Sequence, residues 1–435
     1  MRLTLIPLLF APALLSAQAP TKLDAEVDRR AHALEAKVVA WRRDIHQNPE
    51  LGNREFRTAK LVSEHLQALG IEVRTGVAKT GVVGILRGGR PGPVVALRAD
   101  MDALPVAEEV DLPFKSTVRS TYNGQDVGVM HACGHDNHVA ILMGVAELLS
   151  GMKAQLQGTV VFVFQPAEEG APVGERGGAA VMLEEGVFDN PKVDAVFGLH
   201  VFPFETGKIV YRSGGLMASS DTYRVVIRGR QTHGALPWNG IDPITVSSQV
   251  ITSMQSLVSR QVDLTLTPAI VTVGYIRGGV RHNIIPDSVE FGGTIRTFDE
   301  PTRDSLLVRF QRIVTAMADA NGAKATIVIT PGTPVTYNDP ALTEAMAPTL
   351  RRALGAAQVE IGRQTTTSED YSLFQQKVPG VFYFLGVTPK GTDPAKIAPN
   401  HSPRFFADEA ALVPGVKALS SLAIDYLAMG SKPKM

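Results

Sequence analysis

The chain has a single cysteine, Cys133, among its 435 residues, so no disulfide bond can form within it. It also lacks an excess of either charge, since lysine plus arginine and aspartate plus glutamate each number 43. No long basic block stands out, whereas nucleic-acid binding normally leaves a clustered positive footprint. We therefore expect a small-molecule substrate and no nucleic-acid partner.

The apolar run at the start of the chain has the pattern of a secretory signal peptide. Arg2 is followed by the apolar residues 3–15 and by Ala17-Gln18-Ala19, a small–x–small cleavage pattern. The run is shorter than the roughly 20 residues that a membrane-spanning helix needs, and we expect no other stretch to span a membrane. We predict a signal peptide over residues 1–19 and a periplasmic or secreted protein; a buried N-terminal helix is the alternative. An exported thiol such as Cys133 is protected from oxidation and intermolecular pairing when it is buried or bound to a metal.

The periodicity of most of the chain predicts an α/β domain. Hydrophobic residues make up 44% and charged residues 20% of the sequence, which is typical of globular proteins with large cores. Apolar strand-like runs alternate with helical segments, which predicts a mostly parallel sheet with helices on both faces. We expect helices within 23–69 (broken near residue 49) and over 138–149, 178–185, 341–354, 368–376 and 410–427, and strands over 82–86, 94–98, 159–164, 195–201 and 381–385.

Residues 217–331 show a different order of predicted strands and helices. A strand, a helix, two strands, a helix and a strand follow one another over 221–229, 243–260, 270–277, 290–297, 301–321 and 326–330. This is the order of the ferredoxin-like fold. We predict a catalytic domain in two parts, residues 20–216 and 332–430, with a small α+β domain over 217–331 inserted between them.

The stretch "MHACGHDNH" contains the first candidate metal ligands. Cys133 and His135 are two residues apart, so in an extended or looped backbone their side chains point to the same side. A thiolate and an imidazole together suit zinc and similar transition metals. The spacing alone leaves open that Cys133 is a small buried core residue, and that His138 only stabilises the start of a helix.

Further polar stretches, "LRADMDALP", "FQPAEEG" and "FGLHV", follow apolar strands, and sites in open α/β sheets collect beyond the carboxyl ends of strands. Glu168 and Glu169 are adjacent, so their side chains diverge; one can bind a cation while the other takes a proton from metal-bound water. A solvated acidic turn is the alternative. Asp102 could fix the tautomer of a ligand histidine, and His200 and His401 could supply missing nitrogen ligands.

The ordered motifs of the chain resemble those of the metal-dependent aminoacylase/carboxypeptidase superfamily. The resemblance is to its amidohydrolase branch, which includes hippurate hydrolases, N-acyl-amino-acid amidohydrolases and plant auxin-conjugate hydrolases. It extends over roughly residues 35–428. The motifs that carry it are "RRDIHQNPELG", "ALRADMDALP", "MHACGHDNHVAIL", "QPAEEG", "GLHVFP", "QTHGALPWNGIDP", "RHNIIPDSV", "TSEDYS" and "NHSP".

The resemblance implies a fold, a cofactor and roles for individual residues. The catalytic domain would be metallo-exopeptidase-like, and the inserted domain would be a lid and a dimerisation module, giving a homodimer or a higher homo-oligomer. Two divalent ions per subunit would be held by Cys133, His135, Glu169, His200 and His401. The metal could be zinc, manganese, cobalt or nickel, because the ligand set combines a soft thiolate with a hard carboxylate.

The resemblance also implies a reaction, the hydrolysis of the amide bond of N-acyl or N-aroyl amino acids by a metal-bound hydroxide. Glu168 would be the general base, Asp102 would support the ligands, and His233, often from the partner subunit, would polarise the scissile carbonyl. Asn283 and Arg296 would bind the substrate's carboxylate, although Arg296 could instead pair with a neighbouring acid. The rivals are a dipeptidase or carboxypeptidase with the same site, a silent binding protein, and a redox role for Cys133.

Two short stretches depart from the family pattern. Many relatives have "GFEE" after "PEL", whereas this chain reads "GNRE" over residues 52–55, and many have glycine where this chain has Asn137. A glycine-rich stretch, "APVGERGG", follows Glu169. We expect these departures to tune the choice of substrate and to leave the ligand set intact.

Overall fold

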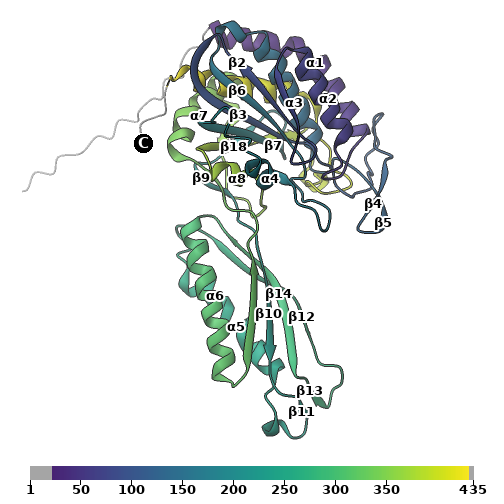
Figure 1. Ribbon diagram of the computed structural model, residues 1–435, viewed down its shortest axis with the longest axis vertical. Coiled ribbons are helices and arrows are strands. Elements are labelled where there is room, and N and C mark those ends of the chain that lie inside the picture. Colours follow the sequence, from purple (N-terminus) through teal and green to yellow (C-terminus); the bar gives the residue numbers. More distant parts are fainter. Residues whose placement is uncertain (1–21, 431–435) are drawn as a thin grey trace, which may run out of the picture.

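The large domain in the computed structural model is built on an eight-stranded sheet (Figure 1). The structure describes residues 22–430, so the predicted signal peptide lies outside the described residues. The central strands β6, β3, β7 and β18 run parallel, while β1, β2 and β8 add antiparallel pairs. This confirms the prediction of a mostly parallel α/β sheet. In sheet order the strands are β1 (Glu72–Val77), β2 (Gly81–Arg87), β6 (Gln157–Gln165), β3 (Arg90–Asp100), β7 (Ala195–Glu205), β18 (Gly380–Thr388), β8 (Ile209–Tyr211) and β17 (Val359–Ile361).

Helices cover both faces of this sheet. Along β6, Phe162 packs into the core on one face, and its neighbours Val161 and Val163 pack into the core on the other, as the period of two along a strand requires. Both faces are therefore apolar and need a covering layer. The first core includes residues of α1 (Lys22–Gln47), α2 (Phe56–Ala68), α3 (His135–Ser150), α7 (Pro340–Leu354) and α9 (Leu412–Ala428), and the second includes residues of α4 (Gly178–Glu184) and α8 (Tyr371–Gln375).

Two expectations from the sequence were wrong in this domain. The helix expected over 368–376 begins only at Tyr371, because Glu369 and Asp370 instead accept hydrogen bonds from Arg98. The segment Glu409–Ala428 is long and apolar enough to span a membrane, although we expected no such stretch. The most apolar part of this segment is 78% buried inside the structure, so its apolar residues belong to the core of the large domain.

The inserted domain has a four-stranded antiparallel sheet in the order β12-β14-β10-β15. Its element order is that of the ferredoxin-like fold. Asp242 and Asp299 cap the two helices, each followed by a proline in the first turn, which is a common way to begin a helix. The elements are β10 (Asp221–Arg228), α5 (Pro243–Gln261), β12 (Ala269–Gly278), β14 (Ser288–Thr297), α6 (Glu300–Ala320) and β15 (Lys324–Thr330).

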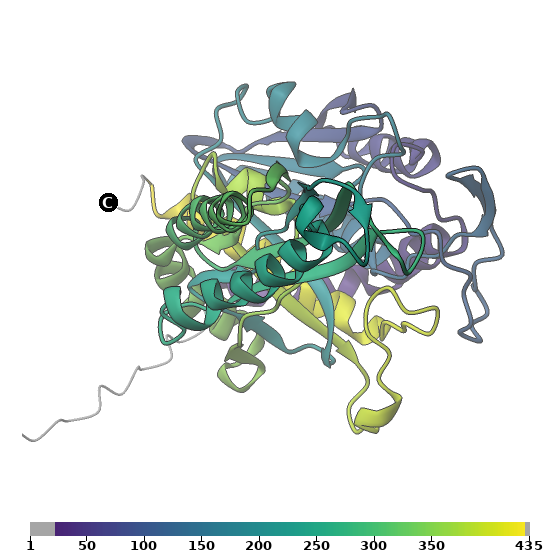
Figure 2. The ribbon, with the colours of Figure 1, turned by 90° about the horizontal axis from the view of Figure 1, so that it is seen from below.

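The two domains are joined by paired strands. The chain leaves the large domain after β9 (Gly214–Met217) and returns at β16 (Thr336–Asn338), and these strands pair with each other. The inserted domain extends away from this junction (Figure 1) and lies in front of the large domain when seen from below (Figure 2). Its far tip carries the short strands β11 (Thr232–His233) and β13 (Ile284–Ile285). The fold therefore separates this tip from the large domain of the same chain.

Candidate metal centre

The five predicted ligands meet beyond the carboxyl ends of the central strands. They line or adjoin a cavity of about 440 Å³. Cys133 precedes α3 and His135 is its first residue, Glu169 follows β6, His200 lies within β7, and His401 follows β18. Because neighbouring parallel strands end at one edge of the sheet, residues up to 268 positions apart in sequence come into contact here.

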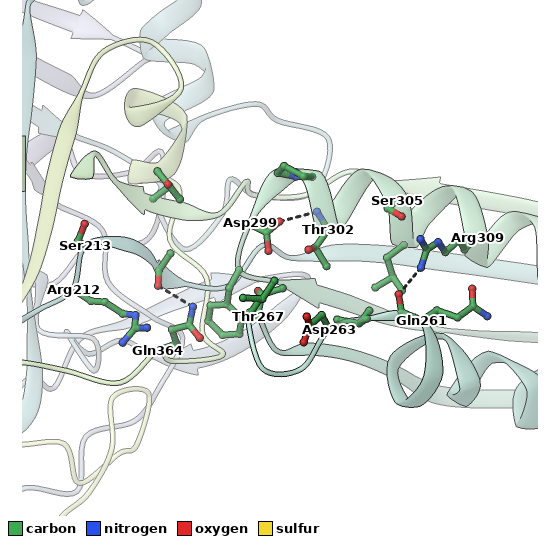
Figure 3. Close-up of a pocket in the computed structure, with 17 residues that line it drawn as sticks. Arg212, Ser213, Gln261, Asp263, Thr267, Asp299, Thr302, Ser305, Arg309 and Gln364 are labelled. Atoms are coloured by element: carbon green, nitrogen blue, oxygen red, sulfur yellow. Dashed lines mark hydrogen bonds between the residues drawn. The ribbon is translucent and has the colours of Figure 1, made fainter. Parts of the chain in front are cut away.

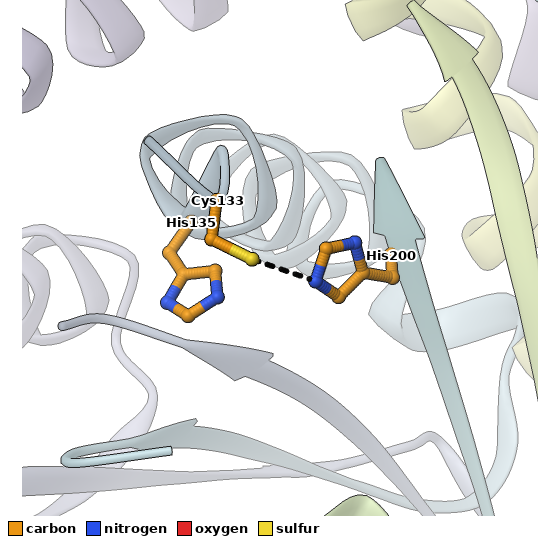
Figure 4. A group of neighbouring side chains, drawn as sticks. All are labelled: Cys133, His135 and His200. Carbon is orange, nitrogen blue, oxygen red and sulfur yellow. Dashed lines mark hydrogen bonds between the residues drawn. The ribbon is translucent and has the colours of Figure 1, made fainter. Parts of the chain in front are cut away.

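Cys133, His135 and His200 form the first group of potential ligands (Figure 4). All three are buried, and one ligand atom from each lies within 4.8 Å of the others. The Sγ atom of Cys133 is 3.3 Å from Nε2 of His200. The Nδ1 atom of His200 donates to the carbonyl oxygen of Val201 at 2.7 Å, so Nε2 presents its lone pair toward Cys133. This is the orientation that a metal-ligating histidine needs.

Cys133, Glu169 and His401 form the second group. The Nε2 atom of His401 lies 2.9 Å from Oε1 of Glu169 and 3.3 Å from Sγ of Cys133. His401 has a left-handed backbone with φ 69°, and its N–H donates to the carbonyl oxygen of Ala132 at 2.8 Å. The neighbouring Asn400 donates to the carbonyl oxygen of Cys133 at 3.0 Å. Because Cys133 belongs to both groups, they offer two adjacent positions for a cation.

Asp102 connects His135 to the turn that carries Glu168 and Glu169, called the acidic turn below. Its Oδ1 atom lies 3.4 Å from Nδ1 of His135. The two oxygens of Asp102 also accept the backbone N–H groups of Glu168 and Glu169, each at 3.0 Å. The side chain of Asp102 thus orients one potential ligand and the backbone of two more acidic residues.

Two further polar residues of "MHACGHDNH", Asp136 and His138, have structural partners. His138 donates from Nδ1 to Asp100 at 2.5 Å and accepts the N–H of Val201 on Nε2 at 2.8 Å, so both of its ring nitrogens are engaged. Asp136 contacts Arg42 at 2.8 Å and His46 at 2.9 Å. These contacts resolve the question about His138 that the spacing left open, because it supports the site from behind and has no nitrogen left for a metal.

A buried network around Arg98 was missed by the sequence analysis. The guanidinium donates to Asp100 at 2.7 Å, Glu369 at 2.9 Å and Asp370 at 3.1 Å, and to Gln165 at 2.8 Å. Burial alone would lower the pKa of Arg98, but the carboxylates of Asp100, Glu369 and Asp370 raise it overall. An arginine within the apolar run "VVALR" was the signal that could have revealed this network.

The electrostatics of the site fit a bound cation. Burial and the charge of Glu169 raise the pKa of the Cys133 thiol well above its usual value, so a thiolate here needs a nearby positive charge. Both ring nitrogens of His135 are buried, and neither has a hydrogen-bond partner among the described residues. Burial opposes a charge on this ring, yet Asp100 and Asp102 raise its pKa to about 10. Sulfur, nitrogen and carboxylate donors together suit a transition metal.

Glu168 differs from its neighbour Glu169. Burial disfavours the charge of Glu169, but the contact with His401 lowers its pKa overall. For Glu168, burial and the charges of Glu369 and Glu169 raise the pKa well above its usual value. Two adjacent carboxylates therefore have opposite tendencies to hold a proton, which is the usual signature of separate chemical roles.

The three residues predicted to contact substrate do not lie together in one chain. Arg296 lines the cavity and donates to the carbonyl oxygen of Thr366 at 3.0 Å; it forms no salt bridge within residues 22–430, so pairing with a neighbouring acid does not account for it. His233 is exposed at the tip of the inserted domain, beside Asn283, whose carbonyl oxygen accepts the N–H of Gly234 at 2.8 Å. The strands β11 and β13 at this tip lie far from β7 and β18 of the large domain (Figure 1), and the cavity is lined by residues of β7 and of the loops that follow the central strands.

A second cavity of about 520 Å³ lies at the junction of the two domains (Figure 3). Several of its polar side chains make structural contacts: Asp299 accepts the N–H of Thr302 at 2.8 Å, and Gln364 donates to the carbonyl oxygen of Gly215 at 3.1 Å. Among the described residues, no group of potential metal ligands includes a residue that lines this second cavity. The chemistry of the described residues is therefore concentrated around Cys133.

Comparisons with known proteins agree on one family. Residues 96–425 match the model of Peptidase family M20/M25/M40. Thermostable carboxypeptidase 2 of Saccharolobus solfataricus is 41% identical over 396 residues, which cover 90% of this chain and 96% of the carboxypeptidase. IAA-amino acid hydrolase ILR1-like 4 of Arabidopsis thaliana is 42% identical over 395 residues, which cover 90% of this chain and 86% of the hydrolase.

A solved structure extends the likeness to three dimensions. The YXEP protein of Bacillus subtilis, a dinuclear metal binding peptidase from the M20 family, matches with a TM-score of 0.77 at 35% identity, covering 91% of this chain and 99% of that one. These findings confirm the resemblance seen in the ordered motifs. The chain belongs to peptidase family M20/M25/M40.

Proposed function

We propose that this protein is a metal-dependent amidohydrolase that cleaves the amide bond of N-acyl or N-aroyl amino acids. The observation that carries the proposal is the adjacent pair Glu168 and Glu169 in one cavity. Glu169 faces Cys133 and His401, whereas Glu168 lines the cavity with a raised pKa. A protein that only binds its ligand has no use for a second, proton-accepting carboxylate beside the ligand set. The relatives named as amino-acid conjugate hydrolase and carboxypeptidase support the same chemistry.

The site would hold two divalent ions, as the dinuclear metal binding relative does. When bound, such ions lower the pKa of a water molecule and polarise a carbonyl group. The groups around Cys133 would hold them, and Asp102 would keep His135 and the acidic turn in place. Glu168 would take a proton from the attacking water and deliver it to the leaving amine. Arg296 would bind the substrate's carboxylate, which it can do with two parallel hydrogen bonds.

One wall of the cavity is apolar and suits an uncharged acyl group. Phe202, Pro203 and Met217 line the cavity, and Phe202 and Met217 belong to the same hydrophobic cluster. The ring of Phe202 packs on that of Phe384 with centroids 4.6 Å apart, which fixes its position. A dipeptide would bring a charged amino group to this wall, and burying an unpaired charge is costly. This favours an N-acyl or N-aroyl amino acid over a free dipeptide.

The peptidase alternative has its own support in the name of the 41% identical carboxypeptidase. It requires the same metal site and differs only in the group accepted on the acyl side. A panel of N-benzoylglycine, N-acetyl amino acids and free dipeptides, tested after controlled metal reconstitution, separates the two. Faster turnover of dipeptides than of N-acyl amino acids would favour the peptidase.

We also propose that His233 and Asn283 act in the cavity of a second copy of the chain. They lie side by side at the tip of the inserted domain, and the cavity of their own chain is far from them. A homodimer related by a two-fold axis would let each tip serve the other subunit. The export predicted from residues 1–19 is likewise a proposal, and the burial of Cys133 is compatible with an oxidising compartment.

Replacement of the proposed base should separate chemistry from metal binding. We expect Glu168→Gln to lower kcat by about 100-fold to 10,000-fold, because general-base catalysis is lost, while the metal content per chain stays unchanged. Steady-state kinetics and elemental analysis give the two readouts. Glu64→Gln, at an exposed position of α2, is the control and should match the wild type. Near-normal turnover of N-acyl amino acids by Glu168→Gln would refute the assigned role.

Truncation of the apolar wall should change selectivity. We expect Phe202→Ala to lower kcat/KM for N-benzoyl amino acids by about 10-fold to 100-fold, in line with the loss of one large apolar contact. The value for N-acetyl amino acids should change little. Phe204→Ala removes a neighbouring ring that packs on Phe202 but does not line the cavity and serves as the control. An unchanged benzoyl-to-acetyl ratio in Phe202→Ala would contradict the assignment of this wall.

Mixing two inactive variants tests the contribution of the second copy. Glu168→Gln and His233→Ala should each be nearly inactive. Glu168→Gln lacks the general base, and His233→Ala lacks a donor to the oxyanion, whose loss costs about 100-fold to 1,000-fold in rate. In a 1:1 mixture about half of the dimers are mixed, and each mixed dimer has one complete cavity out of two. The activity of the mixture should therefore return to about one quarter of the wild-type level.

The control for this experiment is Glu168→Gln mixed with the double variant Glu168→Gln/His233→Ala, which should stay inactive. A peptide tag on one of the two variants, with native mass spectrometry of the mixture, checks that mixed dimers form. A mixture of the single variants that stays inactive despite mixed dimers would mean that His233 does not act across subunits.

A further inference from the structure

The four residues of "GNRE" lie against the loop of residues 166–177. This catalytic loop follows β6 and carries the acidic turn near its start and Glu175 near its far end. Glu55 is fully buried; its Oε1 atom accepts the N–H of Ala167 at 2.8 Å, and its Oε2 atom accepts the hydroxyl of Thr80 at 2.6 Å. A Cβ atom at Gly52 would lie 2.7 Å from the carbonyl oxygen of Gly170, so glycine lets this segment approach the loop closely. None of these four residues is among those that line the cavity.

The acidic turn needs such support because its backbone is strained. Ala167 has φ 51°, a left-handed conformation that costs roughly 1–2 kcal/mol for a residue with a Cβ atom. The N–H groups of Ala167, Glu168 and Glu169 point toward carboxylates, the first to Glu55 and the next two to Asp102. Two buried carboxylates thus hold consecutive backbone donors and determine where the side chains of Glu168 and Glu169 point.

The same segment also holds the far end of the loop. Asn53 donates to Glu175 and to the carbonyl oxygen of Arg176, each at 3.0 Å. Arg54 and Lys79 contact Glu175 at 2.5 Å and 2.6 Å. These ion pairs are largely exposed, so they contribute little compared with the buried hydrogen bond of Glu55.

We propose that Glu55 is a positioning residue that holds the Glu168–Glu169 turn in its working geometry, through the hydrogen bond to the N–H of Ala167. This inference rests on the proposed function, in which Glu168 is the base and Glu169 a metal ligand. Glu55 and Gly52 match the family pattern "GFEE"; the two residues that differ from it, Asn53 and Arg54, contact Glu175 and not the cavity. Loss of the acceptor at position 55 disturbs proton transfer and metal retention together, while the substrate-binding wall stays intact.

The decisive variant is Glu55→Met, which has a similar length and no acceptor oxygen. We expect kcat to fall by about 100-fold, the cost of a small misplacement of catalytic groups, with KM little changed. Affinity for Co²⁺, measured by competition with a chelating indicator, should fall by about 10-fold to 100-fold, as for other supports of metal ligands. Glu55→Gln keeps an acceptor oxygen for Ala167 and should restore most of both quantities.

Two further variants complete the test. Glu175→Gln weakens only the exposed far end of the loop and should leave kcat and Co²⁺ affinity near wild type. Thr80→Val removes the hydroxyl that orients Glu55 and should lower both quantities in the same direction as Glu55→Met; it decides the matter if Glu55→Met does not fold. Wild-type kcat and Co²⁺ affinity in folded Glu55→Met, or in Thr80→Val when Glu55→Met is unfolded, would overturn the proposal.

The Co²⁺ measurement separates this inference from the proposed function. If the wild-type protein hydrolysed no N-acyl amino acid, the proposed function would fail. A fall in Co²⁺ affinity in Glu55→Met that is restored in Glu55→Gln would still support the positioning role. The two proposals therefore fail on different observations.

Discussion

The site depends on buried negative charge at the ends of the central strands. Asp100, Glu369 and Asp370 converge there, and the guanidinium of Arg98, with a fully buried side chain, is hydrogen-bonded to all three. Removing one partner from such a network leaves an uncompensated charge in a medium of low polarity, so its members are strongly interdependent. Arg98 carries one positive charge, which these three acids share. Among residues 22–430, no lysine or arginine is a main contributor to the charge balance of Cys133 or Glu169. A metal ion supplies the missing charge, and this requirement explains why a thiol, imidazoles and a carboxylate are gathered in one place.

The sequence predicts the fold and the gathering of ligands well, because both follow from local patterns. Alternating strands and helices imply a parallel sheet, and polar residues at strand ends imply convergence. The Arg98 network could not be predicted from the sequence, because Arg98 and Glu369 are 271 positions apart and pair only in the folded chain. The same contact ended the helix that local propensity extended back to Ser368. Likewise, only the N–H of Val201, 63 positions away, shows that both nitrogens of His138 are occupied.

The departures from the family pattern have a different meaning in three dimensions. Asn137 donates to the carbonyl oxygen of Gly134 at 3.2 Å and to Asp136 at 3.0 Å, and it is buried behind the ligands. Residues 52–55 support the catalytic loop. Neither departure lines the cavity, so any effect of these residues on substrate choice would act through the residues that they support. Under the proposed function, selectivity comes from the apolar residues around Phe202 and from the groups brought by the inserted domain.

The central claim is that Cys133, the one cysteine of the chain, is shared by both groups of metal ligands. The most direct test is the number of ions bound per chain after reconstitution, measured by elemental analysis on the wild type and on Cys133→Ala, with circular dichroism to verify the fold. The account predicts about two ions per wild-type chain, as in other two-metal hydrolases, and less than about one in folded Cys133→Ala. A folded Cys133→Ala protein that still bound about two ions and kept its activity would contradict it.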